Sequence, residues 1–93
     1  MEFEWDPKKE AKNLRKHKVA FSEAATVFAD TLSTTVPDPD HSEDEARYLL
    51  IGLSQRSRLL MVAHTERGER IRIISARTLT PAEREAYEEE SNR

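Results

Sequence analysis

The segment at residues 66–77, E-R-G-E-R-I-R-I-I-S-A-R, holds the side chains best suited to chemistry, because it carries four arginines beside three isoleucines. A guanidinium group presents a planar fork of N–H donors that binds a phosphate through two hydrogen bonds at once. Successive side chains of a β-strand point to opposite faces, so an arginine held in a strand has a defined direction. The segment therefore indicates a surface that can hold an anion.

Cleavage of RNA is one reaction that such a surface suits. The 2′-hydroxyl of RNA can attack the adjacent phosphate without a metal ion if the protein splays the scissile step, neutralises the charge on the phosphorane and moves two protons. Arginine serves the second task, and histidine, glutamate or tyrosine can carry protons when their surroundings tune them. Composition alone leaves this as one possibility among several.

Other chemistries find little support in the residues. His17, His41 and His64 are far apart in the chain, and neither an H-x-x-x-H nor a paired-carboxylate spacing marks a metal site. Only two glycines occur, Gly52 and Gly68, which excludes phosphate-binding loops and dinucleotide folds. Cysteine is absent, which excludes disulfides and thiolate catalysis, and the serines lack a nucleophile elbow. No metal and no cofactor are therefore expected.

Length and composition predict one domain over residues 1–93, with a frayed acidic tail from about residue 88. Only 37% of the 93 residues are hydrophobic, so the core must be thin, and a thin core favours a partner. The chain begins M-E-F-E-W-D, which lacks the pattern of a targeting segment, and no window approaches the ~20 apolar residues that a bilayer span needs. The expectation is a cytoplasmic protein with no membrane partner.

Charge is segregated along the chain, although the net charge is only −3. Residues 1–36 carry six basic and six acidic side chains, and residues 37–45 add five acidic ones. Residues 46–84 carry eight arginines against three glutamates, and the remaining tail contributes −3. The pattern predicts a basic sheet flanked by an acidic loop and an acidic tail, both of which are ordinarily solvated.

Helix signals predict a short edge strand at 3–5, then a helix that opens at Asp6-Pro7, an N-cap followed by proline, and runs to about His17. In this helix Ala11 and Leu14 are expected to face inward. The opposite side carries a basic stripe of Lys8, Lys12 and Arg15 or Lys16.

A second helix is expected over E-A-A-T-V-F-A at 23–29, with Ser22 as its cap and with Val27 and Phe28 in the core. The prolines at 37 and 39 are expected to end regular structure in a polar loop.

Three antiparallel strands should follow. Residues 46–54 are nearly all apolar, as expected for a central strand covered on both faces. Residues 59–66 and 69–76 form a hairpin if Arg67-Gly68 is its two-residue turn. That register sets Arg70 and Arg72 on one face beside small neighbours, in a shallow basic pocket, unless a bulge at the turn breaks it. The opposed pairs would be Thr65 with Arg70, Ala63 with Arg72, and Met61 with Ile74.

Thr80-Pro81-Ala82-Glu83 is a capping box with proline at the first helical position, which predicts a last helix at about 81–89. The fold class is therefore α+β: a short N-terminal strand, two helices, a three-stranded antiparallel sheet and a C-terminal helix. The helices cover one sheet face, and the other face is partly open.

The ordered set of motifs resembles the BrnT family of type II toxins from about Phe3 to Tyr87. The residues that carry the resemblance are F-E-W-D-P-K-K at 3–9, N-L-R-K-H-K-V-A-F-S-E-A at 13–24, V-F-A-D at 27–30, D-H-S at 40–42, Glu45, Arg47, Gly52, E-R at 66–67, R-I-R-I-I-S-A-R at 70–77 and E-R-E-A-Y at 83–87.

The resemblance implies a RelE-like fold and a metal-independent endoribonuclease that depresses translation and growth. It also implies a BrnA-like antitoxin with a ribbon-helix-helix domain, which would bring the toxin to operator DNA indirectly. Where the family usually reads K-H-G, this chain has Lys18, so a backbone turn that favours glycine must be met by lysine.

The resemblance ranks the catalytic candidates. Arg67 at the hairpin tip is the first choice for phosphate binding, although a solvated turn arginine is the ordinary alternative. Arg77 is second, and an ion pair with Glu83 or a C-terminal glutamate is its alternative. Glu66 and Glu45 are candidate bases, and salt bridges to nearby arginines compete with that role.

The other candidates for catalysis or RNA binding each have a structural role as the alternative. Tyr87 either stacks on a base and shares in proton transfer or anchors the last helix. His17 is a catalytic candidate and Lys16 an RNA contact, yet a cation at a helix end is favoured by the dipole in any case. Lys12, Arg70 and Arg72 are candidate RNA contacts, and Arg70 and Arg72 suit an antitoxin equally well. For Trp5 and His64 packing roles are favoured.

A second hypothesis from another class stays open beside the ribonuclease. The same arginine-rich sheet could grip a partner protein or a nucleic acid and perform no chemistry, and the negative net charge keeps this hypothesis in play.

Overall fold

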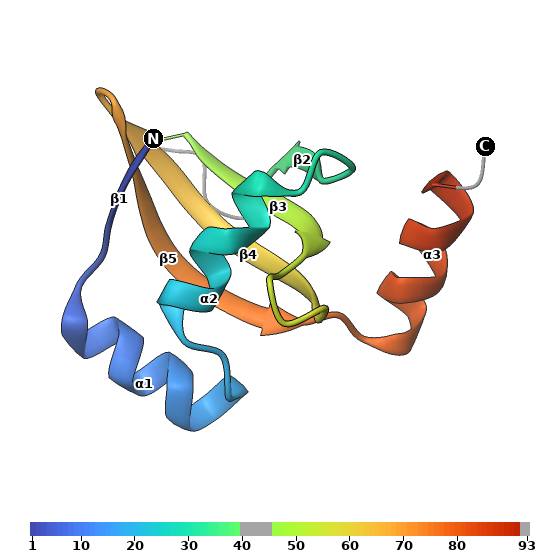
Figure 1. Cartoon of the computed structure of the whole chain (residues 1–93), viewed down its shortest axis with the longest axis horizontal. Helices are drawn as coiled ribbons and strands as arrows, with labels where there is room; N and C mark the ends of the chain where they lie inside the picture. Colours follow the sequence, from blue (N-terminus) through green and yellow to red (C-terminus); the bar gives the residue numbers. More distant parts are fainter. Residues whose placement is uncertain (40–45, 92–93) are drawn as a thin grey trace.

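The computed structural model describes residues 1–39 and 46–91 and shows a five-stranded mixed sheet with helices beside it (Figure 1). The sheet order is β1-β5-β4-β3-β2, with β1 parallel to β5 and the other neighbours antiparallel. In chain order the elements are β1 (Glu2–Glu4), α1 (Pro7–His17), α2 (Phe21–Thr26), the 3₁₀ helix η1 (Val27–Ala29), β2 (Thr34–Pro37), β3 (Arg47–Leu53), β4 (Leu59–Arg67), β5 (Arg70–Thr78) and α3 (Pro81–Ser91).

The predicted α+β class is confirmed, but the predicted three-stranded antiparallel sheet is wrong. The N-terminal edge strand forms one residue earlier than expected, at Glu2–Glu4, and pairs in parallel with β5. The strand β2 was not expected, because Pro37 and Pro39 suggested a loop. Proline is tolerated on an edge strand, because one side of that strand makes no hydrogen bonds to a neighbouring strand. Pro37 is the last residue of β2, which lies at the sheet edge.

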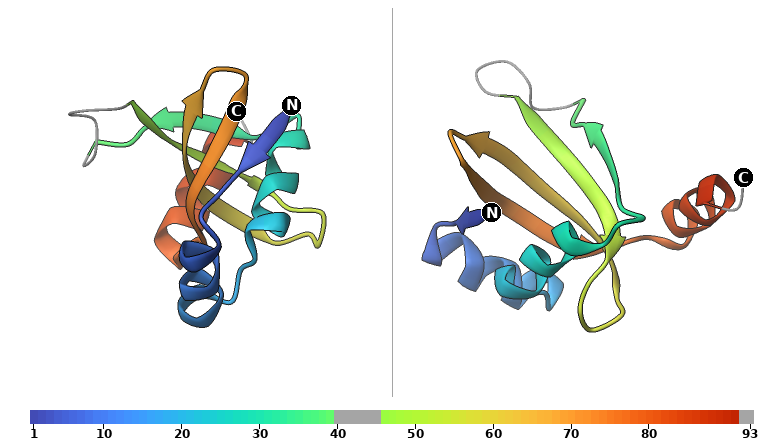
Figure 2. Two further views of the ribbon diagram at one scale, coloured as in Figure 1. Left: turned by 90° about the vertical axis from the view of Figure 1, so that its left-hand side faces the viewer. Right: turned by 45° about the horizontal axis from the view of Figure 1, so that its top comes forward.

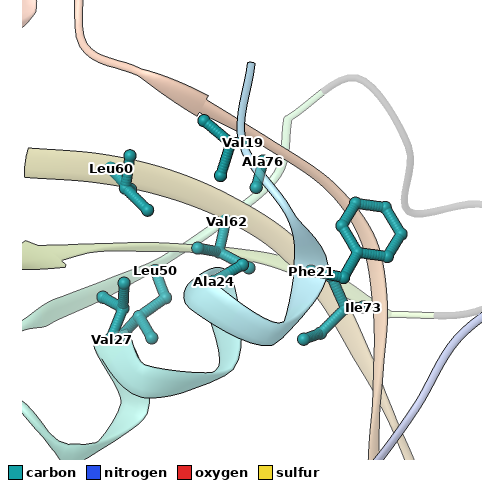
Figure 3. Packing of buried hydrophobic residues seen from close by; sticks show 9 residues of the cluster. All are labelled: Val19, Phe21, Ala24, Val27, Leu50, Leu60, Val62, Ile73 and Ala76. Carbon is teal, nitrogen blue, oxygen red and sulfur yellow. The ribbon is translucent and has the colours of Figure 1, made fainter. Parts of the chain in front are cut away.

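A single apolar core lies between the sheet and α2 with its flanking segments (Figure 3). Its fully buried members are Val19, Phe21, Ala24, Val27, Leu50, Leu60, Val62, Ile73 and Ala76. Val27 is in the core as predicted, and Phe28 and Trp5 pack against it. The Trp5 ring meets Phe21 edge-on at 6.1 Å.

His64 is also buried on this side, as predicted, with 4% of its surface exposed. Its ring lies 4.9 Å from Phe28 and 5.8 Å from Tyr48. Burial lowers the pKa of His64, so the neutral ring is favoured in the core.

The other sheet surface, called here the outer face, is not covered by α1 or α2. The expectation that residues 46–54 form a central strand is confirmed, because β3 lies between β4 and β2. The expected cover on both faces is wrong, because β3 alternates between buried Leu50 and half-exposed Leu53. Figure 2 shows α3 on the side of the molecule away from α1. Register and alternation place these side chains on the outer face: Arg47, Leu49, Met61, Ala63, Arg70, Arg72, Ser75 and Arg77.

The β4–β5 hairpin turns at Gly68-Glu69, so the predicted turn at Arg67-Gly68 is wrong by one residue. Arg67 pairs with Arg70, and Thr65 lies opposite Arg72 rather than Arg70. Gly68 has φ of +61°, and a positive φ at the first central residue is the mark of a type II′ turn, which glycine favours.

A β-bulge interrupts this hairpin at Ile74, which sequence analysis did not place. His64 pairs with Ile73 and Ala63 pairs with Ser75, which leaves Ile74 without a partner in β4. The predicted pairs of Ala63 with Arg72 and of Met61 with Ile74 are therefore wrong. The extra residue changes the side-chain alternation, and it sets Arg77 on the outer face, where Arg70 and Arg72 also lie. An unbroken ladder would turn Arg77 toward the helices.

Helix α1 begins and ends as predicted, with the Asp6 carboxylate accepting from the Lys8 N–H at 2.9 Å. Its inward residues were predicted wrongly: Ala11 and Leu14 are exposed, and Asn13 is buried. Hydrogen bonds rather than apolar contacts determine which face of α1 packs against the sheet, because that face meets the backbone at the edge of β5. The Asn13 Nδ2 donates to the carbonyls of Val19 and Ala76, both at 2.9 Å, and its Oδ1 accepts from the Ala76 N–H at 3.1 Å.

Helix α2 begins at Phe21 without a side-chain cap, so the expected capping role of Ser22 is wrong. The Glu10 carboxylate of α1 accepts the Phe21 N–H at 3.0 Å instead. An orphan donor at a helix start can be satisfied by any well-placed acceptor, and here the preceding helix supplies it.

The capping box of α3 is confirmed. The Thr80 N–H donates to Glu83 Oε1 at 2.9 Å, and the Glu83 N–H donates to Thr80 Oγ1 at 3.2 Å. The helix continues to Ser91, two residues past the predicted end. In the part of the chain that is described, no helix is long and apolar enough to cross a bilayer.

Replacing Asn13 by alanine should destabilise the fold strongly. Asn13→Ala leaves two carbonyls and one N–H at a buried position without partners, at a cost of about 3 kcal/mol in the free energy of unfolding. Urea unfolding followed by circular dichroism measures this cost, and Arg15→Ala, an exposed change in the same helix, is the matched control. A cost below about 0.5 kcal/mol for Asn13→Ala would contradict the assigned role.

Lys18 should be a position where glycine stabilises the protein. Lys18 ends α1 with φ 60° and ψ 31°, and its N–H donates to the Leu14 carbonyl. Lys18→Gly should raise the free energy of unfolding by about 1 kcal/mol, because relief of the left-handed backbone outweighs the added chain entropy of glycine. Lys16→Gly, at a helical position, should lower it by a similar amount. Equal effects of the two changes on Tm would argue against this explanation.

Candidate functional site

The bulge at Ile74 and Ser75 lies where two surface depressions meet, and together they form what is called here the bulge groove. One depression, of about 180 Å³, lies between α1 and β5 and is lined by Lys9, Lys12, Asn13, Lys16, His17, Ile74 and Ser75. The other, of about 280 Å³, lies on the outer face and is lined by Asp38, Arg47, Leu49, Met61, Ala63, Ile74, Ser75 and Arg77. The groove thus brings together four predicted site residues: Lys12, Lys16, His17 and Arg77.

The lysine side of the groove follows from the helical period of α1. Lys9, Lys12 and Lys16 are three and four residues apart, so they lie on one helix face. The predicted stripe is correct for Lys12 and Lys16, whereas Lys9 rather than Lys8 lines the depression. His17 is half-buried in the last turn, beside these lysines.

Arg77 stands at the other side of the groove and is held by Glu83. Its Nη1 donates to Glu83 Oε1 at 2.7 Å and to the Thr78 carbonyl, and its Nη2 donates to Glu83 Oε2 at 2.9 Å and to Met61 Sδ. Four of its five N–H donors are therefore in use. The hydrogen bond from Arg77 lowers the pKa of Glu83 to about 2, and the same bond raises the pKa of Arg77.

The Arg77–Glu83 ion pair is the alternative that the sequence suggested for Arg77, and it bears on function. A carboxylate that grips a guanidinium through two parallel bonds occupies the same fork that a phosphate would use. A phosphate that binds Arg77 through this fork must therefore displace Glu83.

Arg70 and Arg72 lie farther along the outer face, next to glutamates of β1. Arg72 Nη1 is 2.8 Å from Glu4 Oε2, and Arg70 Nε is 3.3 Å from Glu2 Oε2. The parallel register of β1 and β5 creates these pairs, because it sets Glu2 beside Arg70 and Glu4 beside Arg72. The shallow basic pocket expected here is thus an ion-pair ladder instead.

Glu66 and Arg67 are exposed near the hairpin tip, away from the groove. Arg67 is separated from Met61, the partner of Arg77, by six residues of β4. At ~3.3 Å per strand residue the two predicted phosphate-binding arginines are roughly 20 Å apart along the strand. They are therefore expected to contact different parts of a bound chain.

Tyr87 makes the contact of a helix anchor. Its hydroxyl donates to the Leu32 carbonyl at 3.1 Å and ties α3 to the segment before β2. The candidate base Glu45 and the histidine His41, expected to be solvated, lie outside the described residues.

Several residues of the groove were not predicted from the sequence. Arg47 alternates with Leu49 and could have been placed by that pattern, whereas Asp38 carries no local signal in its Pro-Asp segment. Among the described residues, no three histidine, cysteine, aspartate or glutamate side chains gather as a metal site would require.

A second cavity, of about 340 Å³, lies near the β3–β4 turn and is lined in part by Lys18, Glu23, Arg56 and Arg58. The carboxylate of Glu23 accepts from Ser54 Oγ at 2.6 Å and binds Arg58 through both of its oxygens. The bond from Arg58 lowers the pKa of Glu23. These contacts join α2 to the β3–β4 turn, which makes the pair a structural link.

The chain is similar to a described protein family and to a solved structure. A family model described as "Ribonuclease toxin, BrnT, of type II toxin-antitoxin system" matches residues 5–83. The 1.1 Å crystal structure of the Brucella abortus ribonuclease toxin BrnT has a similar fold, with a TM-score of 0.64 and 22% sequence identity over 86% of this chain and 97% of that one. No curated protein sequence matches the chain.

The Arg77–Glu83 pair should make the free energy of unfolding depend on pH in the acidic range. Glu83 has a pKa of about 2 in the fold, below its ordinary 4.5, so its contribution is complete above pH 4.5 and is lost as the pH falls toward 2. Glu83→Gln, which keeps a capping-box residue, should therefore cost about 1 kcal/mol at pH 6, a value reduced by solvent screening, and almost nothing at pH 2.

Unfolding free energies measured from pH 2 to pH 7 test this dependence. Glu88→Gln is the control, because its pair with Arg84 is exposed and should show a difference below about 0.5 kcal/mol throughout. If the free energies of unfolding of the wild type and of Glu83→Gln change with pH in parallel, the Arg77–Glu83 pair is not the source of the pH dependence.

Proposed function

The chain belongs to the BrnT family of ribonuclease toxins of type II toxin–antitoxin systems, and we propose that it is an endoribonuclease that cleaves RNA by attack of the 2′-hydroxyl on the adjacent phosphate. The observation that carries the proposal is the bulge groove, where lysines, a histidine and an arginine line one continuous surface. Cationic side chains and proton carriers supply what this reaction needs, so we propose that it is independent of metal ions.

The residues of the groove suggest separate roles in the proposed reaction. Lys12 and Lys16 hold the RNA backbone, since lysine acts on phosphates as a point charge. Arg77 exchanges Glu83 for the scissile phosphate and stabilises the charge that develops there. His17, half-buried at the groove, is the proposed proton carrier.

The remaining candidates are placed beyond the groove. Glu66 and Arg67 lie at the hairpin tip, at a distance from Arg77. Their proposed roles as a base and a phosphate ligand therefore belong to an alternative in which the scissile phosphate lies at the tip rather than at Arg77. Tyr87 would act after α3 moves, because its hydroxyl is bound to the Leu32 carbonyl.

The wider role follows from the family. We infer that the protein depresses translation and growth in the cytoplasm, and that a BrnA-like ribbon-helix-helix antitoxin neutralises it and links it indirectly to operator DNA. Arg70 and Arg72, whose charges are matched by β1, suit contacts with RNA or with this antitoxin. A relation of the fold to RelE-type ribonucleases stays a prediction.

One observation favours a second candidate, a binding module without catalysis. The outer-face arginines Arg70, Arg72 and Arg77 all form ion pairs with glutamates. Such pairs are expected of arginines that stabilise the fold rather than of arginines that take part in catalysis. Growth arrest on induced expression, relieved by coexpression of the antitoxin, would separate a toxin from such a module.

The ribonuclease hypothesis predicts cleavage in the presence of EDTA. Purified protein should cut single-stranded RNA, leave 2′,3′-cyclic phosphate ends, and fail on a substrate with 2′-deoxyribose at the scissile position. Arg77→Ala and His17→Ala should each lower the cleavage rate by about 100-fold or more, whereas Arg15→Ala should leave it unchanged. Circular dichroism checks that each variant is folded. Cleavage that requires added Mg²⁺ would refute the mechanism.

A further inference from the structure

The cavity near the β3–β4 turn has a cationic lining, and it is called here the turn cavity. It has a volume of about 340 Å³ and is bordered by Lys18 at the end of α1 and by Arg56 and Arg58 of the turn. The Arg58 Nη2 donates to the Lys18 carbonyl at 3.1 Å, which fixes the end of α1 beside the turn (Figure 1). Cations from two distant segments of the chain thus meet at one depression of the surface.

The positive charge of the turn cavity is not cancelled by the glutamate that it contains. Glu23 is buried, and its carboxylate accepts from Ser54 Oγ and binds Arg58 through both oxygens, so the charges of Glu23 and Arg58 offset each other. Arg56 has only a loose contact with Glu23, at 3.9 Å between Nη1 and Oε1, and 73% of its side chain is exposed. Lys18 is exposed and has no ion-pair partner among the described residues. The charges of Lys18 and Arg56 are therefore left for a ligand.

The backbone around this cavity has an uncommon conformation at two positions. In the described part of the chain, Lys18 and Ser57 are the non-glycine residues with positive φ, both at 60°. Lys18 borders the cavity, and Ser57 lies between Arg56 and Arg58 in the turn. Strained conformations of this kind gather at functional sites, where the surrounding structure holds them in place. Both positions therefore point to a ligand at this end of the molecule.

The turn cavity adjoins the lysine depression, the part of the bulge groove between α1 and β5, because α1 lines both. His17 borders the lysine depression, and Leu14 and Lys18 border the turn cavity. Consecutive helix residues are about 100° apart around the axis, so the two depressions lie at adjacent faces of the last turn of α1. An extended chain that lies along the lysines can therefore continue around the end of α1 to Arg56.

We propose that the turn cavity binds a backbone phosphate of the RNA substrate that flanks the scissile step, and that Lys18 and Arg56 are its ligands. The inference rests on the proposed ribonuclease function and adds a second contact with its substrate. Lysine and arginine are common phosphate ligands, and such contacts position a nucleic acid without reading its bases. Leu14, which is 47% exposed, gives the cavity an apolar wall against which the sugar or base can pack.

A nucleic acid fits this surface better than an acidic peptide does. Its phosphates are evenly spaced along one strand, so they can meet the cations of both depressions in turn. Single-stranded nucleic acids are commonly bound in this way, by a path of cations that follows the backbone.

Binding of oligomers that cannot be cleaved tests the assignment. A dodecamer of 2′-O-methyl RNA lacks the attacking hydroxyl and can reach both depressions, whereas a trimer fills the bulge groove alone. In fluorescence anisotropy, Lys18→Gly and Arg56→Ala should each weaken binding of the dodecamer about 5-fold and reduce the slope of log K against log salt concentration by about 0.7. Binding of the trimer should not change.

Lys18→Gly is the sharper of the two variants. It should stabilise the fold while it weakens RNA binding, and a lysine with a merely structural role would not separate these effects. Lys8→Ala is the charge-matched control, because Lys8 is exposed on α1 and lines neither depression. Its effect on the dodecamer should be below about 2-fold. Arg56→Ala removes a highly exposed side chain, so it keeps the proposal testable if Lys18→Gly does not fold.

The same affinity for the dodecamer in the wild type, Lys18→Gly and Arg56→Ala would overturn the proposal, as would equal losses for the trimer and the dodecamer. Loss of binding to the copurified antitoxin with unchanged binding of the dodecamer would also overturn it, and would assign the cavity to the protein partner. Length-dependent losses in a protein that cleaves no RNA would support the turn cavity and refute the ribonuclease function. Cleavage of RNA without such losses would do the reverse.

Discussion

The side chain of Asn13 makes the contact on which the arrangement of the site depends. Strand β1 pairs with β5 only at residues 70–72, so the backbone of Ala76 is left at the sheet edge beyond it. The Asn13 amide takes both the N–H and the carbonyl of Ala76, as a neighbouring strand would, and also binds the Val19 carbonyl in the α1–α2 connection. Directional bonds thereby position α1 in a protein whose apolar core is small, and they close a sheet edge.

The bulge at Ile74, two residues before Ala76 in β5, completes the site. A strict alternation along β5 would send Arg77 toward the helices once Ile71 and Ile73 face that way. One additional residue reverses the alternation, so that Ala76 faces the core and Arg77 joins the outer face. Asn13 and the bulge act on neighbouring residues of the same strand, which is why the lysines of α1 and the arginine of β5 border one groove.

Local signals in the sequence predicted local structure well. Asp6-Pro7 and the Thr80 to Glu83 capping box act within a few residues, and both helices begin where these signals place them. The register of the hairpin could not be derived in the same way, because it depends on which side of Gly68 the turn falls. The inward position of Asn13 was also missed, because its partner is 63 residues away in the chain.

The candidate site was predicted only in part, because some of its residues are brought together by long-range contacts that leave no local signal. Lys12 and Lys16 follow from the helical period, His17 was a candidate at the helix end, and Arg77 was identified through the family pattern. Asp38 was missed because the strand before it carries proline and exposed residues, which read as a loop. Its place beside Arg47 is set by the pairing of β2 with β3, a long-range contact without a local signature.

The glutamates of β1 have an effect that extends beyond their ion pairs with β5. By matching Arg70 and Arg72, Glu2 and Glu4 reduce the positive potential over that part of the outer face. The lysine depression has no carboxylate among its described lining residues, so the charges of its lysines are not offset by acidic side chains in the lining. An approaching polyanion would then be drawn to α1 first, at a rate that falls as salt screens the attraction, and would spread toward the sheet afterwards. The N-terminal strand, three residues long, thus offsets the positive charge at one end of the outer face.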